Sequence, residues 1–437
     1  MKKARILFGA LAITALLSAC RDDASFPSGG HGDVETGVKN SDTFAVLQSK
    51  SAKRGVAFGF TTEADYDLLM PSISWCYNWA SGGQNKMSKL EQYGVEYNPM
   101  CWNGNFSADN IVEKFSSVYP SSTALLAYNE PNLTDQANMT PAQAATYWPE
   151  VLSIVERTGK RLVSPAMNWG TLSGWSDGVK WLDSFFQQSG VSVDDVDAIA
   201  VHVYMSSATA LMGDIERYKK FGKPIWLTEF CNWQAGSEEA QMKFMSHCFN
   251  ALEQDDDVER YAWFTPRGST SVKGMNLLTS KSPIALTNTG ILFTNFSTFD
   301  QKVVYPLNQR IPAEHYRACA EKAMAVLPSA DTDDEGVLML SSFSKGHWVD
   351  YKVDFDGSKN GAFLLRYASA NDFELTISSV DSDGNATPWQ TITMPGTGKK
   401  TNWTTAKVSL ELPSSAAVIR LSTGGGMVNI NWLEFTN

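Results

Sequence analysis

The sequence predicts an α/β protein in which a barrel of eight strand–helix units is followed by an all-β, jelly-roll-like sandwich. Two observations support this prediction. Short apolar runs alternate with helical patterns between residues 54 and 265, and strand-like alternation without helices follows after residue 305. Eight alternating units over about 250 residues are typical of a TIM-like (β/α)8 barrel. Period-2 strands separated by turn residues are typical of a β-sandwich.

The first twenty residues predict a signal peptide rather than a part of the fold. Basic residues precede an apolar run at 6–17, which is too short to span a bilayer. The Leu-Ser-Ala-Cys stretch that ends at Cys20 resembles a bacterial lipobox, with cleavage before Cys20 and lipid on its thiol. We therefore expect an outer-membrane or cell-surface lipoprotein of a bacterial cell envelope. An ordinary signal peptide with a coincidental cysteine is the alternative.

Residues 21–50 are rich in Ser, Gly and Asp and predict a flexible tether between the lipid and the fold. The barrel is then expected over residues 51–304. Its eight candidate strands are residues 54–60, 73–79, 95–102, 124–130, 161–167, 198–204, 224–230 and 259–265. Helical patterns lie between most of them. The clearest one begins at Thr140-Pro141, where Gln143 completes a capping box.

The charge and aromatic content of the chain indicate which classes of ligand it could bind. The chain has 36 Lys and Arg against 47 Asp and Glu, a formal net charge of −11. This charge disfavours a nucleic-acid partner, because phosphate backbones attract basic proteins. Fourteen Trp, 14 Tyr and 22 Phe, with many of the Trp outside periodic core positions, favour flat apolar ligands such as sugar rings.

The cysteines that follow Cys20 do not predict a metal site, because no two of them form a CxxC pair. We expect them to be small buried residues. A disulfide among them, such as one between Cys76 and Cys101, is left open by the sequence. The five are Cys76, Cys101, Cys231, Cys248 and Cys319.

Two glutamates stand at the ends of the predicted fourth and seventh strands. Glu130 follows an apolar run in Asn-Glu-Pro, and Glu229 follows another in Thr-Glu-Phe. In a barrel, the carboxyl ends of the strands face the active site. Paired carboxylates there are what glycoside hydrolysis requires, and Asn129 could hydrogen-bond a sugar 2-hydroxyl. Taken singly, each glutamate could instead belong to a strand-end turn or a buried ion pair.

An ordered set of short stretches resembles glycoside hydrolase family 128, whose catalytic domain is Asl1-like. The stretches are Lys53-Arg54-Gly55-Val56-Ala57, Trp75-Cys76-Tyr77-Asn78-Trp79, Asn98-Pro99-Met100-Cys101-Trp102, Tyr128-Asn129-Glu130-Pro131-Asn132, Val163-Ser164-Pro165-Ala166, Val201-His202-Val203-Tyr204, Trp226-Leu227-Thr228-Glu229-Phe230 and Tyr261-Ala262-Trp263-Phe264. The resemblance implies a retaining endo-β-1,3-glucanase, with Glu130 as acid/base and Glu229 as nucleophile. A raised pKa is then expected for Glu130, because it must be protonated at the working pH.

Further residues are predicted to line this site. His202 and Tyr204 follow the sixth strand, and Tyr204 could hydrogen-bond the nucleophile; a core role for His202 stays open. Trp263 resembles the tryptophan under the reactive sugar in this clan, and Asn168 is a candidate polar contact. Candidate stacking platforms, about half of which are expected to prove structural, are Trp75, Trp79, Trp102, Trp169 and Trp233.

Residues 305–437 carry motifs that resemble carbohydrate-binding module family 6. They surround His315, Trp348, Trp403 and Trp432, and the resemblance implies that Trp403 and Asn429 contact sugar. The chain departs from that family at three positions. Pro312 replaces a calcium-binding acid, which leaves a structural calcium in doubt, and Ser342 and Lys400 replace aromatics. A purely structural role for this domain is therefore the alternative, with Trp432 in its core.

The sequence thus predicts a monomeric hydrolase that acts on a polysaccharide, needs no metal or redox cofactor and contacts a membrane only through its N-terminal lipid. Two alternatives stay open: a retaining glycosidase on another β-glycan, such as xylan or β-1,4-glucan, and a non-catalytic surface glycan-binding lipoprotein. Both glutamates keep their flanking residues, which favours the enzyme.

Overall fold

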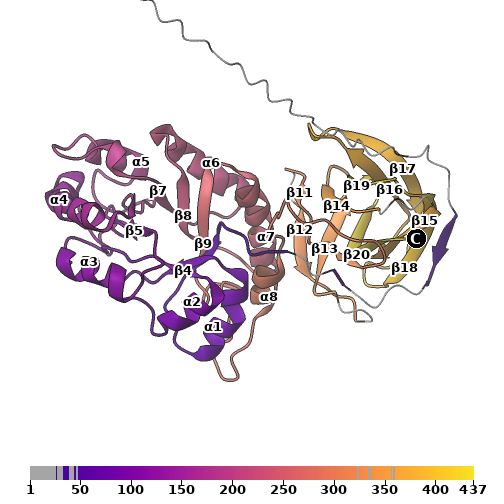
Figure 1. The fold of residues 1–437 in the computed structure, drawn as a ribbon, viewed down its shortest axis with the longest axis horizontal. Helices are drawn as coiled ribbons and strands as arrows, with labels where there is room; N and C mark the ends of the chain where they lie inside the picture. Colours follow the sequence, from indigo (N-terminus) through magenta and orange to yellow (C-terminus); the bar gives the residue numbers. More distant parts are fainter. Residues whose placement is uncertain are drawn as a thin grey trace, which may run out of the picture.

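The computed structural model describes residues 26, 33–38, 44–45, 48–321, 324–332, 336–355, 357 and 360–437. A barrel lies beside an all-β sandwich (Figure 1). The predicted signal peptide and Cys20 lie outside the described residues. Within them, no helix is both long and apolar enough to cross a membrane.

Each predicted barrel strand is present, in the predicted order and as a shorter segment. The strands are β2 (Arg54–Ala57), β3 (Trp75–Tyr77), β4 (Glu96–Tyr97), β5 (Ala124–Leu126), β6 (Arg161–Val163), β7 (Ile199–Val203), β8 (Ile225–Phe230) and β9 (Val258–Trp263). Parallel ladders join β4-β3-β2-β9-β8-β7 and, separately, β5-β6. Single parallel bridges, Met100–Leu126 and Val163–Ala198, connect these two groups at both ends. The strands therefore follow one another around a barrel.

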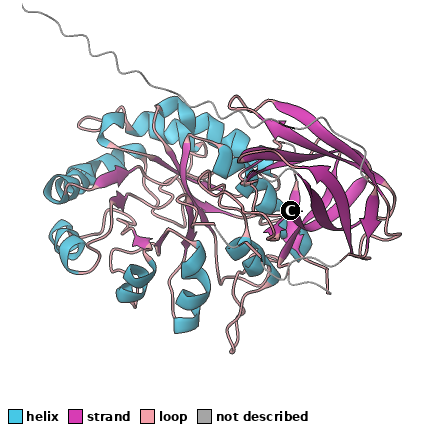
Figure 2. Cartoon of the chain, turned by 45° about the vertical axis from the view of Figure 1, so that its right-hand side comes forward, coloured by secondary structure: helices cyan, strands magenta, loops and turns pink. Residues whose placement is uncertain are grey.

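Helices surround these strands on the outside (Figure 2). They are α1 (Glu63–Leu69), α2 (Met87–Tyr93), α3 (Ala108–Ser117), α4 (Pro141–Thr158), α5 (Gly178–Phe185), α6 (Ala208–Tyr218), α7 (Glu238–Gln254) and α8 (Asn288–Asn295), with short 3-10 turns η1 (Met70–Ser72), η2 (Val193–Asp195) and η3 (Lys219–Phe221). The predicted capping box of α4 is confirmed: the Thr140 side chain accepts from the Gln143 N–H, and the Gln143 side chain accepts from the Thr140 N–H.

The barrel interior is filled by two indoles among small side chains. Trp75 and Trp226 are fully buried and lie 5.3 Å apart between ring centroids. The strands around them contribute mostly alanine: Ala57, Ala124, Ala166, Ala198, Ala200 and Ala262. Small residues leave the volume that two indoles occupy, so this end of the barrel is a packed core and not a channel.

The sandwich consists of two antiparallel sheets. One contains, in order, β1 (Val34–Thr36), β18 (Thr404–Glu411), β15 (Asn360–Ala368), β20 (Met427–Thr436), β13 (Leu338–Ser344) and β12 (Ala325–Pro328), with β10 (Ile311–Pro312) also paired to β20. The other contains β11 (Ala318–Cys319), β14 (Trp348–Val353), β19 (Ala417–Gly425), β16 (Phe373–Val380) and β17 (Ala386–Met394). Trp432 is fully buried, as the sequence predicted.

The predicted flexible tether is wrong for the described part of residues 21–50. Strand β1 pairs with β18 in the register Val34–Val408, and in Figure 1 it is the indigo arrow at the edge of the sandwich. The Arg310 guanidinium lies over the Phe44 ring, 4.1 Å from the ring centroid, and the Ala45 N–H donates to the Arg310 carbonyl. The composition of the segment is tether-like, but β18 offers an unpaired sheet edge, and pairing satisfies both backbones.

The two domains meet along α7. The helix packs on the barrel, while two polar residues on its other side bond to the sandwich backbone. Ser246 Oγ donates to the Val326 carbonyl (2.6 Å), and Asn250 Nδ2 donates to the Met324 carbonyl (3.2 Å). Asn250 Oδ1 also accepts from the Tyr316 hydroxyl (2.6 Å). All three residues are buried, so the two domains form one packed unit.

The five cysteines after Cys20 are all buried and free, which excludes the bridge between Cys76 and Cys101 that the sequence left open. Burial raises the pKa of each thiol, including Cys319 to about 12. These residues are therefore small apolar core residues, as predicted.

Candidate active site

A pocket of about 490 Å³ opens at the carboxyl ends of the barrel strands. Both predicted glutamates lie in it: Glu130 follows β5, and Glu229 belongs to β8. The pocket is lined by Trp79, Trp102, Asn129, Glu130, Leu133, Gln136, Asn168, Tyr204, Glu229, Trp233 and Phe264. This combination of carboxylates, amides and aromatic rings is the kind of lining that binds a sugar chain.

Glu229 is held by hydrogen-bond donors on both oxygens. Its Oε1 accepts from the Tyr77 hydroxyl (3.0 Å) and from the Trp79 indole N–H (2.7 Å). Its Oε2 accepts a short hydrogen bond from the Tyr204 hydroxyl. These donors come from the ends of β3 and β7, so strands on both sides of β8 fix the direction of the carboxylate.

Glu130 is held by two nitrogen atoms. Its Oε1 accepts from Asn168 Nδ2 (2.8 Å) and lies 2.8 Å from His202 Nδ1. Its backbone has a φ of 45°, a left-handed conformation that is costly for a residue with a side chain. One carboxylate oxygen of Glu130 and one of Glu229 lie within 4.8 Å of each other.

His202 connects the two glutamates from below the pocket. It is fully buried, and its Nδ1 lies 2.8 Å from Glu130 and 3.6 Å from Glu229 Oε2. Its Nε2 is buried without a hydrogen-bond partner in the described part of the chain. The histidine therefore contacts both carboxylates and does not line the space that a substrate would fill.

The carboxyl pKa values differ from the sequence-based prediction. Burial alone would raise the pKa of Glu130, but the hydrogen bond and charge of His202, with the Asn168 amide, outweigh burial and lower it. Burial raises the pKa of Glu229, and the charge of Glu130 adds to this. The expected raised pKa of Glu130 is therefore wrong for the free site, because the sequence did not show that His202 contacts this carboxylate.

The comparisons with known proteins agree with this geometry. Residues 55–293, more than half of the chain, match the family described as glycosyl hydrolase catalytic core. The chain belongs to this family. Residues 313–437 match carbohydrate-binding module family 6, so the protein is a glycoside hydrolase with an appended module. Both resemblances predicted from the sequence are confirmed.

Similar proteins support the assignment of the catalytic domain. A family 128 (subgroup II) endo-β-1,3-glucanase from Pseudomonas viridiflava is 37% identical, with a TM-score of 0.52, over 56% of this chain and 98% of that one. A second, from Sorangium cellulosum, is 35% identical with a TM-score of 0.51 over the same shares. Alkali-sensitive linkage protein 1 of Schizosaccharomyces pombe is 30% identical over 228 residues, which span 50% of this chain and 39% of that protein.

Several predicted site residues of this hydrolase do line the pocket. Trp102, Trp233, Tyr204 and Asn168 are among them, as is Trp79. Asn129 also lines it, with Nδ2 donating to Gln136 (3.2 Å) and Oδ1 buried without a partner among the described residues. The acceptor capacity of that oxygen is therefore unused among the described residues.

Two predicted contacts, Trp75 and Trp263, do not reach the pocket. Trp75 is fully buried in the barrel interior and donates to the Lys53 carbonyl (3.0 Å). Trp263 points outward, packs on Phe230 and donates to the Met275 carbonyl (2.8 Å). Successive residues of a strand point to opposite faces, so the next residue, Phe264, takes the expected place in the pocket.

The sequence did not predict Tyr77 and Phe264 as site residues, nor Leu133 and Gln136 of the pocket lining. Tyr77 and Phe264 stand in stretches that resemble the family, within two residues of a tryptophan that was predicted to contact sugar. Alternation along the strand was the signal that could have found Phe264. Trp169 is half exposed (50%), with Arg217 4.7 Å from its ring centroid, and is not part of the pocket lining.

The group of Glu130, His202 and Glu229 could in principle coordinate a metal ion, because one ligand atom of each lies within 4.8 Å of the others. The hydrogen bonds argue otherwise. Donors from Tyr77, Trp79 and Tyr204 already surround Glu229, and such donors stabilise a bare carboxylate. The donor set therefore fits an acid–nucleophile pair better than a metal site.

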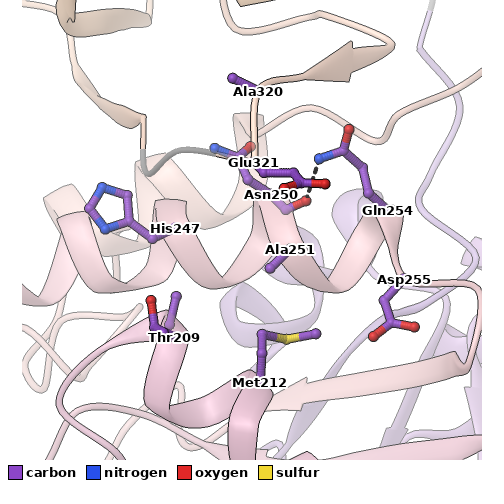
Figure 3. A pocket seen from close by; sticks show the side chains of 10 residues that line it. Thr209, Met212, His247, Asn250, Ala251, Gln254, Asp255, Ala320 and Glu321 are labelled. Carbon is purple, nitrogen blue, oxygen red and sulfur yellow. Dashed lines mark hydrogen bonds between the residues drawn. The ribbon is translucent and has the colours of Figure 1, made fainter. Parts of the chain in front are cut away.

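A different hollow, of about 390 Å³, lies between α6, α7 and the segment at Ala320 and Glu321 (Figure 3). Gln254 Nε2 donates to the Asn250 carbonyl along its rim (2.8 Å). Burial lowers the pKa of His247 to about 4, and Asp255 is paired with Lys219 at 3.0 Å. This hollow therefore lacks the free carboxylate pair that the hydrolase requires.

Asn429 and Trp403, which were predicted to contact sugar, are largely covered in the sandwich. Asn429 is buried, its Oδ1 accepts from the Ser342 N–H (2.8 Å), and its Nδ2 donates to the Lys400 carbonyl (3.0 Å). Trp403 is half-buried against the core. The bonds of Asn429 use one amide hydrogen and one lone pair of its oxygen, and burial leaves little of this side chain open to a ligand.

The residues near the start of the module do not fit calcium either. Pro312 stands in place of one acid, and Glu314 is buried with its Oε2 unpartnered among the described residues. No group of three or more His, Cys, Asp or Glu ligand atoms within the described residues includes Glu314. With no cation beside it among the described residues, burial raises the pKa of Glu314 to about 8.

Proposed function

We propose that the chain is a retaining endo-β-1,3-glucanase, with Glu130 as acid/base and Glu229 as nucleophile. The observation that carries this proposal is the approach of the two carboxylates to within 4.8 Å in an aromatic-lined pocket. Retaining enzymes hold their carboxyl groups about 5–5.5 Å apart, whereas inverting enzymes need about 6.5–9.5 Å to admit a water molecule.

The substrate class rests on relatives. The proteins from Pseudomonas viridiflava and Sorangium cellulosum, which match over nearly their whole length, are endo-β-1,3-glucanases. The pocket supports a neutral glycan of this kind, since the side chains that line it, apart from the two glutamates, are amides, aromatics and Leu133.

In the first step, a Glu229 oxygen attacks the anomeric carbon as the glycosidic C–O bond breaks, and Glu130 gives a proton to the leaving oxygen. The donors from Tyr77, Trp79 and Tyr204 orient the attacking carboxylate. The free Oδ1 of Asn129 is placed to accept from the 2-hydroxyl of the reacting sugar, a contact that strengthens as charge develops.

In the second step, Glu130 removes a proton from water, and the resulting hydroxide displaces Glu229 from the anomeric carbon. Once Glu229 is esterified, it no longer repels charge on Glu130. Glu229 and Glu130 raise the pKa of His202 against the effect of burial, so His202 carries a proton 2.8 Å from Glu130, which can pass through Glu130 as the leaving oxygen gains charge.

The test combines product analysis with chemical rescue. The wild type should release short β-1,3-oligosaccharides from linear β-1,3-glucan and not from xylan or β-1,4-glucan. With an activated aryl β-glycoside and azide, Glu229→Ala should form the α-glycosyl azide. Under the same conditions, Glu130→Ala should form the β-glycosyl azide. Swapped anomers would reverse the two roles. Products from another polymer alone would replace the substrate class and keep the mechanism.

The N-terminal assignment is part of the same proposal: a monomeric lipoprotein of the bacterial cell envelope, lipidated at Cys20 and facing its polysaccharide at the cell surface. The lipobox sequence supports it. In a bacterial host, Cys20→Ala should move the enzyme from the membrane fraction to the soluble fraction, while Cys319→Ala should not. Membrane association of Cys20→Ala would contradict the lipid anchor.

A further inference from the structure

A second hollow on the barrel, of about 480 Å³, lies beside the catalytic pocket. It is lined by residues 103–105, residues 137–139 and three residues of α4, and we call it the amide hollow. Trp102 lines the pocket and Asn103 the hollow; Gln136 lines the pocket and Ala137 the hollow. The Ala137 N–H also donates to the Asn129 carbonyl (3.2 Å). The two spaces therefore share a wall beside Glu130.

The lining of the amide hollow fits an uncharged ligand rich in hydroxyl groups. None of its lining residues is charged, and three are asparagines: Asn103, Asn105 and Asn138. Among the described residues, the side-chain amides of Asn105 and Asn138 have no hydrogen-bond partner. Each amide offers two donors and one acceptor, which match the hydroxyls of a sugar. A phosphate or carboxylate would find no cation here.

Tyr147 gives the hollow an aromatic surface. Its side chain is 40% exposed, unlike most large apolar residues of the chain. Its ring rests on Gly104, where a Cβ atom would come within 2.5 Å of the ring carbons. Glycine thus lets the backbone support the ring from one side, while solvent reaches the other. A supported, half-exposed ring is a surface on which a sugar can stack.

We propose that the amide hollow is a distal subsite, which binds a further glucose unit of the β-1,3-glucan chain beyond those held in the catalytic pocket. This inference rests on the proposed function, since it concerns the same polymer. Tyr147 stacks on the sugar face, while Asn105 and Asn138 bond its hydroxyls. The hollow thereby makes long chains better substrates than short ones.

The experiment measures kcat/KM on β-1,3-gluco-oligosaccharides from the trisaccharide to the heptasaccharide. In Tyr147→Ala, the value for the longest chains should fall about tenfold, while the value for the shortest cleaved chain stays within about twofold. Gly104→Ala should give the same length-dependent loss, because the added methyl displaces the ring. Tyr147→Phe keeps the ring and should retain most of the preference for long chains.

Tyr93→Ala removes a half-buried tyrosine of α2, outside both spaces, and serves as the matched control. If Tyr147→Ala lowered kcat/KM equally for all chain lengths, the ring would support the catalytic pocket and not bind a distal sugar. If kcat/KM did not fall for any chain length, the hollow would not bind sugar. Either result would overturn the proposal. The wild type reports on the proposed function separately, because cleavage of the series by the wild type does not depend on Tyr147.

Discussion

The carboxylate of Glu229 is surrounded by three donors, and each bond stabilises its charged form. Tyr204 contributes the shortest of these bonds. A hydrogen bond to a charged group contributes about 1.5–3 kcal/mol. We therefore expect Tyr204→Phe to lower kcat/KM about 10- to 150-fold with the fold unchanged. Tyr128→Phe, which removes a hydroxyl bonded to the Ala144 carbonyl, is the matched control and should leave the rate near wild type. A Tyr204→Phe rate near that of the wild type would mean that this bond does not support the nucleophile.

His202 should influence how kcat/KM depends on pH. Burial raises the pKa of Glu229, and the charge of His202 opposes that effect. Since Glu229 must be ionised to attack, its protonation sets the acid limb of the kcat/KM profile. His202→Asn removes the opposing charge, so the pKa of Glu229 should rise and the acid limb should move to higher pH. An acid limb at the wild-type position in this variant would contradict the contact as a source of pKa control.

The sequence was sufficient to predict site residues that belong to a recognisable motif. It was not sufficient for residues whose role depends on which way the side chain points. Glu130 and Glu229 follow apolar strands, and strand ends converge in any barrel. Trp263 and Phe264 are neighbours in one motif, and only the pleat decides which one faces the pocket. The lowered pKa of Glu130 depends on one contact with His202, which no spacing in the sequence reveals.

Among the elements, β1 makes the clearest prediction. It adds three residues to the free edge of β18, and Gly37 N–H continues the pairing by donating to the Thr405 carbonyl (2.8 Å). A chain that begins at residue 39 should be less stable to urea than one that begins at residue 33, by about 1–3 kcal/mol from the lost hydrogen bonds. Equal stability of the two truncations would mean that β1 does not stabilise the sandwich.

The sequence predicted the elements where periodicity and burial agree. All eight barrel strands and the change to β-structure after residue 305 were predictable, because both faces of the barrel strands are covered and their apolar runs are short. The docking of β1 was not. Its residues carry no apolar alternation, since the strand lies at an edge and is half-buried to exposed, and its stability comes from an unpaired neighbour far along the chain.

For the molecule as a whole, stability should depend on pH through Glu314. Burial raises its pKa from 4.5 to about 8, so the folded chain keeps a proton that the unfolded chain has released between these values. Stability contributed by this proton is present at low pH and is lost as pH rises toward 8. Between pH 6.5 and 8, the wild type should lose about 1.5 kcal/mol more unfolding free energy than Glu314→Gln.

Urea titrations of both chains at the two pH values measure this difference. The window above pH 6.5 avoids the opposite effect of His247 and His315, whose pKa values burial lowers to about 4. Parallel changes in the two chains would show that Glu314 ionises normally in the folded protein.

The docking of the N-terminal segment would also limit how far an enzyme lipidated at Cys20 could move from the membrane. Phe26 packs against Trp389 of the sandwich, with ring centroids 5.3 Å apart, only six residues after Cys20. For a chain lipidated at Cys20, as proposed, that leash spans at most about 20 Å, whereas a free segment up to residue 51 would span about 110 Å. For a chain anchored in this way, the distance between the bilayer and the catalytic cleft would be limited mainly by the dimensions of the folded protein and not by the length of a free tether.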